Sequence, residues 1–251
     1  MIRGVLLAAL ALAAPAAGAP SAGAAQRSPV PILMYHHLGV PPAGARSPAL
    51  WVRPARFAEQ VRALRRAGYQ AVTLGRVWRA WNGIGSLKLP RRPIVLTFDD
   101  GYADQVTHAL PVLARERWPG VLNLAVDFLP GMGGVPAVQR LLAARWEVDS
   151  HSLSHADLTT LDPTALQAEV EGSRARIREL LGGGAFFFSY PNGRLNATVV
   201  SAVRRAGYLA ATTTRHGYAT PRDLMRLSRI QVGPAMRGAD LLQRLRVLRP
   251  R

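Results

Sequence analysis

Short apolar segments alternate with helical patterns along nearly the whole chain, and no other feature restricts the possible folds as much. About eight segments have the length and composition of strands, at residues 30–35, 69–73, 93–98, 121–126, 146–149, 186–190, 208–212 and 230–232. Helices are predicted between them, near residues 57–67, 77–81, 102–116, 138–144, 163–181, 196–206 and 240–248. Strict alternation favours a mostly parallel sheet with helices outside it, either open or closed into a barrel. We therefore predict a single α/β domain.

The composition restricts the chemistry. The chain of 251 residues has no cysteine, which excludes a disulfide framework, a thiol nucleophile and a thiolate zinc site. Its 32 Lys and Arg residues against 15 Asp and Glu residues give a formal charge of +17, and Lys88 is the only lysine. The basic residues are scattered and are not interleaved with aromatic residues, so nucleic acid is a disfavoured partner. The charge would suit an anionic surface, or it reflects an arginine-rich composition.

The first residues have the pattern of an export signal. Arg3 precedes an apolar run at residues 5–14, and small residues with Ala-x-Ala cleavage sites follow up to Ala24. We predict a signal peptide at 1–24 and a short leader at 25–29, with a retained anchor as the less favoured alternative. No later segment is long and apolar enough for a membrane span, which takes about 20 residues. We expect an exported monomer, periplasmic or extracellular and associated with the cell wall.

Three polar clusters follow predicted strands, at residues 97–101, 151–155 and 189–193. In parallel α/β folds, functional residues collect at the carboxyl ends of the strands. The first cluster contains the adjacent carboxylates Asp99 and Asp100, whose mutual repulsion a bound cation would relieve. Considered alone, the Asp-Asp-Gly sequence is more typical of a surface turn. Together the clusters predict one polar site at one end of the sheet.

The second cluster supplies two imidazoles. His151 and His155 are four residues apart, a spacing that predicts both on one face of a helical turn, where they can reach one metal ion. With one carboxylate of the Asp pair they make three ligands and leave a fourth position open for water, as in catalytic zinc sites. The other carboxylate is then available to take a proton from that water. The pattern predicts metal-assisted hydrolysis.

The combination of motifs resembles one family. Thr-Phe-Asp-Asp-Gly at 97–101 and His-Ser-x-x-His at 151–155 are similar to motifs of the polysaccharide deacetylases, also called carbohydrate esterase family 4 or the NodB-homology domain. Pro-Ile-Leu-Met-Tyr-His-His at 31–37 is similar to the opening of a secreted branch of that family. The resemblance extends over residues 30–233.

The resemblance implies a fold, a cofactor and a substrate class. The fold would be a distorted (β/α) barrel of about seven to eight parallel strands, with a deacetylase domain at 30–235 and a C-terminal helix or tail at 236–251. The cofactor would be a divalent metal, with Zn²⁺ favoured over Co²⁺, Ni²⁺ or Fe²⁺. The reaction would be hydrolysis of N-acetyl groups on N-acetylglucosamine units in peptidoglycan, poly-N-acetylglucosamine or chitin fragments.

The resemblance also implies residue roles. Asp99 would be the general base, and the metal ligands would be Asp100, His151 and His155. The oxyanion would be held by the metal and by a backbone N–H of the loop formed by Tyr190, Pro191, Asn192 and Gly193.

Two positions depart from the family pattern. Residues 189–192 read Ser-Tyr-Pro-Asn instead of Arg-Pro-Pro-Tyr, so the arginine that orients the base and a substrate-lining tyrosine are expected to be missing. The later Leu-x-His motif ends in Arg229, and a guanidinium cannot act as a general acid near neutral pH. We therefore predict His36 as the acid and His37 as a residue that orients it or packs beside it. The alternative is that both histidines only cap the first strand, and His216 is placed in a solvent-facing loop.

Three other functions are compatible with parts of this pattern. One is a hydrolase of a different amide or of an O-acetyl ester on the same scaffold. Another is an inactive wall-glycan-binding protein that uses its arginine-rich surface. An iron oxygenase with a facial triad is a third, but such sites usually lie on antiparallel strands, which the alternation does not resemble.

Overall fold

Seven parallel strands close into a barrel in the computed structural model, which describes residues 27–85 and 88–250. Around the barrel the strands follow the order β1 (Ile32–Tyr35), β8 (Leu227–Gln231), β7 (Ala210–His216), β6 (Phe187–Ser189), β5 (Glu147–Ser150), β4 (Val121–Leu124) and β3 (Pro93–Asp100). β3 pairs back with β1, and an eighth strand, β2 (Gln70–Ala71), pairs with the start of β3. The predicted barrel of parallel strands in a single domain is confirmed. The predicted signal peptide lies outside the described residues.

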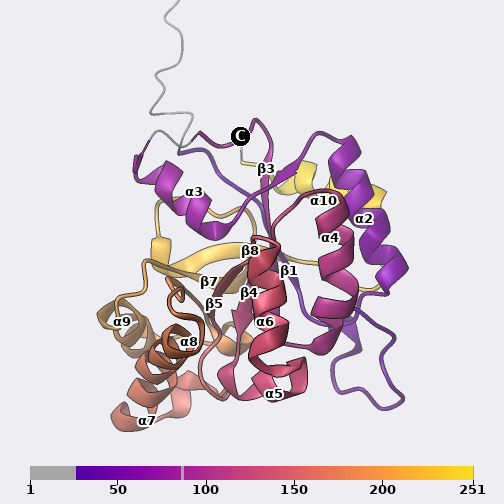
Figure 1. The fold of residues 1–251 in the computed structure, drawn as a ribbon. Helices are drawn as coiled ribbons and strands as arrows, with labels where there is room; N and C mark the ends of the chain where they lie inside the picture. Colours follow the sequence, from indigo (N-terminus) through magenta and orange to yellow (C-terminus); the bar gives the residue numbers. More distant parts are fainter. Residues whose placement is uncertain (1–26, 86–87, 251) are drawn as a thin grey trace, which may run out of the picture.

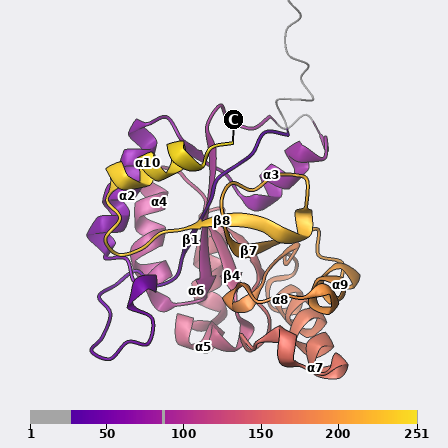
Figure 2. The same cartoon turned by 180° about the vertical axis from the view of Figure 1, so that it is seen from behind.

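The helices surround the barrel, as Figures 1 and 2 show from opposite sides. They are α2 (Pro54–Arg66), α3 (Leu74–Trp81), α4 (Leu110–Arg115), α5 (Leu129–Met132), α6 (Gly134–Ala143), α7 (Pro163–Gln167), α8 (Ser173–Leu181), α9 (Ala197–Arg205) and α10 (Gly238–Leu248). Across residues 27–85 and 88–250, no helix combines the length and the apolar character that crossing a membrane requires.

Two regions predicted as single helices contain π-helical turns. Gln105–Ala109 precedes α4, and Ala168–Gly172 separates α7 from α8. Such turns are rare and often occur near functional sites. In the first turn, the Gln105 amide donates to the backbone oxygens of Asp99 (2.6 Å) and His36 (3.1 Å). The turn therefore ties α4 to the ends of β1 and β3.

The barrel interior is apolar where the strands begin and polar where they end. Near the beginning, Val95 and Phe187 belong to a buried apolar cluster that α3 covers with Leu74. Because side chains alternate between the two faces of a strand, the parity that places Val95 inside also places Thr97 and Asp99 inside. Buried polar residues toward the other end include Thr97, Asp99, Asn123, Asp149, Ser189 and Arg229. One half of the interior thus stabilises the barrel by apolar burial, and the other half collects polar groups.

A larger apolar core fills the space between the barrel and the outer helices. α2 contributes Phe57, Val61 and Leu64 to it, as their spacing predicts. α10 lies against α2, and its Leu241 and Leu245 are fully buried (Figure 2). The C-terminal helix is therefore packed on the same core as the rest of the barrel.

The predicted boundaries of two strands are wrong by more than two residues. The strand expected at 230–232 is β8, which begins at Leu227 and ends at Gln231, so it includes Arg229. The strand expected at 208–212 extends to His216, because its pairing with β8 resumes between His216 and Arg229 after a register shift. His216 is therefore the exposed last residue of β7 and is not in a loop.

Candidate active site

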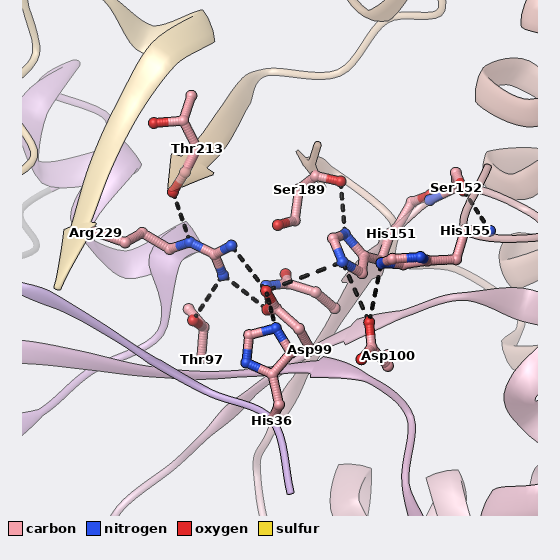
Figure 3. A network of polar contacts seen from close by, with 12 residues as sticks. His36, Thr97, Asp99, Asp100, His151, Ser152, His155, Ser189, Thr213 and Arg229 are labelled. Carbon is pink, nitrogen blue, oxygen red and sulfur yellow. Dashed lines mark hydrogen bonds and ion pairs between the residues drawn. The ribbon is translucent and has the colours of Figure 1, made fainter. Parts of the chain in front are cut away.

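Asp100, His151 and His155 form a group that can hold a metal ion. One possible ligand atom from each lies within 4.8 Å of the others. The Nε2 atoms of both histidines are 3.4 Å from Asp100 Oδ1 (Figure 3). The three residues predicted as ligands are thus brought together at the carboxyl ends of β3 and β5.

The backbone at the end of β3 turns Asp100 toward the histidines. Successive side chains of a regular strand point to opposite faces, so Asp99 and Asp100 would diverge. Asp100 has φ 77° and Gly101 has φ 105°, which are left-handed conformations that break this alternation. A Cβ atom on Gly101 would lie 2.7 Å from Leu124 Cδ1, so the turn requires glycine. Gly101 thereby allows Asp100 to face the metal group while Asp99 remains inside the barrel.

The helical turn predicted for His151 and His155 is wrong. The segment after β5 is a loop in which Ser152 (φ 69°) and His155 (φ 66°) are left-handed, whereas a right-handed helical turn needs negative φ. The Ser152 hydroxyl accepts a hydrogen bond from the His155 N–H at 3.0 Å and stabilises this turn. The two imidazole centroids are 4.9 Å apart. The histidines meet through the folding of the loop and not through helical periodicity.

Glu169, from the π-helical turn, holds the same loop in place. Its Oε2 accepts the backbone N–H groups of Leu153 (2.9 Å) and Ser154 (3.0 Å), and its Oε1 accepts the Ser154 hydroxyl. Hydrogen bonds donated to a charged carboxylate are stronger than those between neutral groups. Glu169 therefore fixes the segment between the two histidines without facing the metal group.

We expect Glu169→Ala to weaken metal binding by about 10- to 100-fold, the usual effect of losing a residue that orients metal ligands. The reason is that the loop would lose three hydrogen bonds and His155 its fixed position. Zinc affinity measured by chelator competition tests this expectation. Glu171→Ala is the matched control, because Glu171 is exposed in the same π-helical turn. Equal zinc affinities in the two variants would contradict the role given to Glu169.

The donor set fits a divalent metal. Asp100 Oδ1 is buried and has no hydrogen-bond partner among the described residues, although it faces two imidazole nitrogens. Burial raises the pKa of Asp100, but its contacts with His151 and the charge of His36 together lower that pKa to about 2, so the carboxylate is charged. His151 Nδ1 lies 2.7 Å from the Ser189 oxygen, an acceptor, which leaves the Nε2 lone pair for the metal. Two imidazoles and a carboxylate suit Zn²⁺ and related ions.

Arg229 and Asp99 form a fully buried, bidentate ion pair inside the barrel. Nη1 and Nη2 of Arg229 each donate to one oxygen of Asp99 at 2.7 Å (Figure 3). The guanidinium also donates to the Thr213 oxygen (2.9 Å) and to the Thr97 hydroxyl (3.1 Å). Asn123 donates to Asp99 Oδ1 at 2.7 Å. These contacts fix the orientation of the Asp99 carboxylate.

The expectation that the base-orienting arginine is missing is therefore wrong. Position 189 is a serine, but β8 supplies Arg229 to Asp99 from another side of the barrel. Burial raises the pKa of Asp99, whereas the charge of Arg229, followed by His151 and His36, lowers it, and the net pKa lies below the ordinary value. Asp99 is thus ionised at neutral pH, as a general base must be.

His36 and His37 have different surroundings. His36 Nε2 is 3.8 Å from Asp99 Oδ2, so this imidazole does lie at the site (Figure 3). Burial lowers the pKa of His36, and the charges of Asp99 and Asp100 oppose that effect. His37 is stacked between Trp51 and Tyr102, with ring centroids 3.8 and 3.5 Å away, and its Nδ1 is 3.1 Å from Asp104 Oδ2. Its ring is therefore fixed by packing.

The loop after β6 can offer backbone N–H groups to a substrate, but not the Tyr190 hydroxyl. The Tyr190 side chain is buried and its hydroxyl donates to the Met225 oxygen at 3.0 Å. Asn192 is left-handed (φ 54°), and a Cβ on Gly193 would lie 2.0 Å from Thr214 Oγ1, so this position requires glycine. The backbone N–H groups of Tyr190 and Gly193 already have acceptors. Pro191 has no N–H, so Asn192 carries the remaining backbone N–H of this loop that can be considered as the oxyanion donor.

Sequence reasoning missed the contacts of Arg229, Asn123 and Glu169. Strand parity is a signal that could have found the first two, because every second residue of β4 and β8 faces the interior. Strand parity does not extend to Glu169, because it lies in the helical segment between β5 and β6 and reaches back to the loop that directly follows β5.

Comparisons with known proteins agree with this geometry. The family model described as polysaccharide deacetylase matches residues 86–211, about half of the chain. YxkH of Bacillus subtilis, whose name places it among polysaccharide deacetylases, is 28% identical over 214 residues, covering 84% of this chain and 74% of its own. A chitooligosaccharide deacetylase of Rhizobium leguminosarum is 32% identical over 136 residues, or 53% of this chain and 57% of the relative.

A solved structure has the same fold. The Streptococcus pyogenes deacetylase PplD, in complex with acetate, aligns with a TM-score of 0.79 and 27% sequence identity. The alignment covers 88% of this chain and 99% of that one.

Proposed function

The chain belongs to the polysaccharide deacetylase family of enzymes, and we propose that it removes N-acetyl groups from an N-acetylglucosamine glycan with the help of a divalent metal. One observation carries the proposal. An ionised carboxylate, Asp99, lies beside a separate group of one carboxylate and two imidazoles. A hydrolase needs both a base for water and a site that polarises the scissile carbonyl.

The two aspartates have separate roles in this mechanism. Asp100, His151 and His155 would hold the metal, which when bound would supply a Lewis acid to activate water and polarise the acetamide oxygen. Asp99 takes the water proton at Oδ2, because Oδ1 accepts from both Arg229 and Asn123, whereas Oδ2 accepts from Arg229 alone. Oδ2 is also the oxygen that faces His36 (3.8 Å) and His151 (4.0 Å).

The remaining steps use the mouth of the barrel. The backbone N–H of Asn192 donates to the oxyanion as water adds to the carbonyl carbon. The C–N bond then breaks, and His36 gives a proton from Nε2 to the departing amine, because an amide anion is too poor a leaving group. Acetate and a free glucosamine amine are the products. Arg229 keeps Asp99 ionised and oriented throughout.

The substrate class follows from the relatives and the predicted export signal. The rhizobial relative is named for chitooligosaccharides, and the solved streptococcal deacetylase was captured with acetate. A signal peptide at 1–24 would deliver the enzyme to glycans outside the cytoplasm, such as peptidoglycan or poly-N-acetylglucosamine.

Acetate release by the metal-loaded protein tests the proposed function. The substrates are chitin oligomers, poly-N-acetylglucosamine, peptidoglycan and O-acetylated xylan, each with Zn²⁺, Co²⁺, Ni²⁺ or Fe²⁺. We expect release from at least one N-acetylated glycan and none from the xylan. Release from the xylan alone would make the protein an esterase. No release from any substrate by stoichiometrically loaded protein would favour a glycan-binding role.

We expect His36→Ala to bind metal and fold normally but to lose turnover on the N-acetylated substrate. The high-pH limb of its kcat/KM profile should change, because that limb reports the acid of the free enzyme. His216→Ala is the matched control, since His216 is exposed at the end of β7. Full turnover in His36→Ala together with a loss in His37→Ala would transfer the acid role to His37.

A further inference from the structure

A cavity lies at the end of the barrel opposite the proposed catalytic groups. It has a volume of about 480 Å³ and is lined by the segments before β1 and β3, by Tyr69 and Tyr218, and by the last turn of α10. Pro93, which begins β3, is in the lining, and Asp99 lies six residues further along the same strand. At about 3.3 Å per residue, the cavity is about 20 Å from the proposed base. Figure 1 shows the start of β3 and the C-terminus at the same end.

The charged residues of this lining all have the same sign. They are Lys88, Arg91, Arg92, Arg246 and Arg249. The lining contains no acidic side chain, and none of these five residues forms an ion pair within residues 27–85 and 88–250. Like charges that converge on one recess repel each other, and an oxyanion placed between them would remove that repulsion.

Arg92 and Lys88 differ from the three other cations of the lining. Arg92 lies over the Tyr69 ring at 4.7 Å and donates to the Ala67 oxygen, so it has a structural role. Arg91, Arg246 and Arg249 are exposed, and their guanidinium groups form no hydrogen bond or ion pair with other residues of the described chain. Lys88 is also exposed, but its backbone oxygen accepts from Arg76. The three free arginines come from two segments that are far apart in the sequence and meet at this cavity.

We propose that this cavity binds a chain of repeated oxyanions, such as a phosphate or uronate polymer, independently of the catalytic site. Guanidinium groups bind phosphate and carboxylate oxygens through paired hydrogen bonds, and this favours arginine for such a ligand. A site of this kind would hold the enzyme on an anionic polymer while the opposite end of the barrel remains open to its substrate.

The shape of the cavity argues against two other polyanions. Single-stranded nucleic acid is usually bound by stacking bases on exposed aromatic rings, whereas Tyr69 is only 7% exposed under Arg92 and Tyr218 is half-buried with its hydroxyl bonded to the Leu245 oxygen. A lipid surface is bound by a protruding face with apolar side chains that insert, whereas these arginines surround a recess. A discrete polymer chain fits the recess better than either.

The test compares two triple variants of equal charge. Arg91→Gln/Arg246→Gln/Arg249→Gln removes three cations at the cavity. Arg140→Gln/Arg178→Gln/Arg204→Gln removes three exposed arginines from α6, α8 and α9. Binding of linear polyphosphate and of polygalacturonate is measured by calorimetry at several salt concentrations. Melting temperatures confirm that each variant is folded.

We expect the cavity variant to bind at least one polymer at least tenfold more weakly than wild type, with a reduced dependence on salt. The control variant should bind nearly as wild type, and the preferred polymer identifies the oxyanion. Equal losses in the two variants would show that net charge alone is responsible, and would overturn the site. Tighter binding to a single-stranded DNA oligomer, or to phosphatidylglycerol vesicles but to neither polymer, would also overturn it.

Discussion

Asp99→Asn should lower the turnover of the metal-loaded enzyme by about a hundredfold or more while leaving the metal bound. An amide cannot take a proton from water as a carboxylate does, and removing a general base typically costs this much. Asp99 is not among the three grouped ligands, so the metal content should remain near one per chain. Acetate release and metal analysis on the same sample check both parts.

The stability of this variant needs its own measurement. Asp99 and Arg229 are both fully buried, and removing one member of a buried ion pair usually costs about 3–5 kcal/mol. Activity must therefore be compared below the melting temperature of Asp99→Asn, determined by circular dichroism. Loss of metal with retained turnover per bound metal would exchange the roles of Asp99 and Asp100. Wild-type turnover would remove Asp99 from the mechanism.

His155→Ala is expected to lower bound metal well below one equivalent and to abolish activity. The variant would leave one imidazole and one carboxylate, which is one ligand fewer than catalytic zinc sites have. His155 is a better choice than His151 for this test, because its side chain is 23% exposed and that of His151 only 2%. Truncating His155 therefore disturbs the packing less.

His108→Ala is the matched control for that experiment. His108 is exposed in the π-helical turn before α4, so the same substitution there should change neither metal content nor turnover. Full metal retention and full turnover in His155→Ala would contradict the assignment of the site.

The local sequence was sufficient to predict a parallel sheet with helices outside it, whereas its closure into a barrel was implied only by the family resemblance. Hydrophobic periodicity distinguishes strands from helices, and the handedness of strand–helix–strand units leaves few arrangements for an alternating chain. The same reasoning placed Asp100, His151 and His155 at strand ends that meet at one edge. These predictions depend on the spacing of apolar residues along the chain and on the handedness of strand–helix–strand units. Both can be applied to a sequence without its tertiary structure.

Local spacing was misleading for the conformation of the histidine loop. His151 and His155 are spaced as on a helix, yet Ser152 and His155 are left-handed. Glu169 accepts the N–H groups of Leu153 and Ser154, and these contacts join the loop after β5 to a π-helical turn about 15 residues further along the chain. A four-residue spacing cannot reveal hydrogen bonds that come from outside the segment.

The sequence by itself determined the type of fold, the end of the barrel that carries the polar residues, and the chemical groups available there. Only the tertiary structure decided which groups pair, and Arg229 is the main example. It reaches Asp99 across 130 residues because the barrel closes and brings β8 into register with its neighbours. Register depends on the packing of all seven strands at once, whereas sequence patterns describe each strand separately. Physically, the presence of two adjacent carboxylates at the end of a strand was local information, and their orientations and charge states were not.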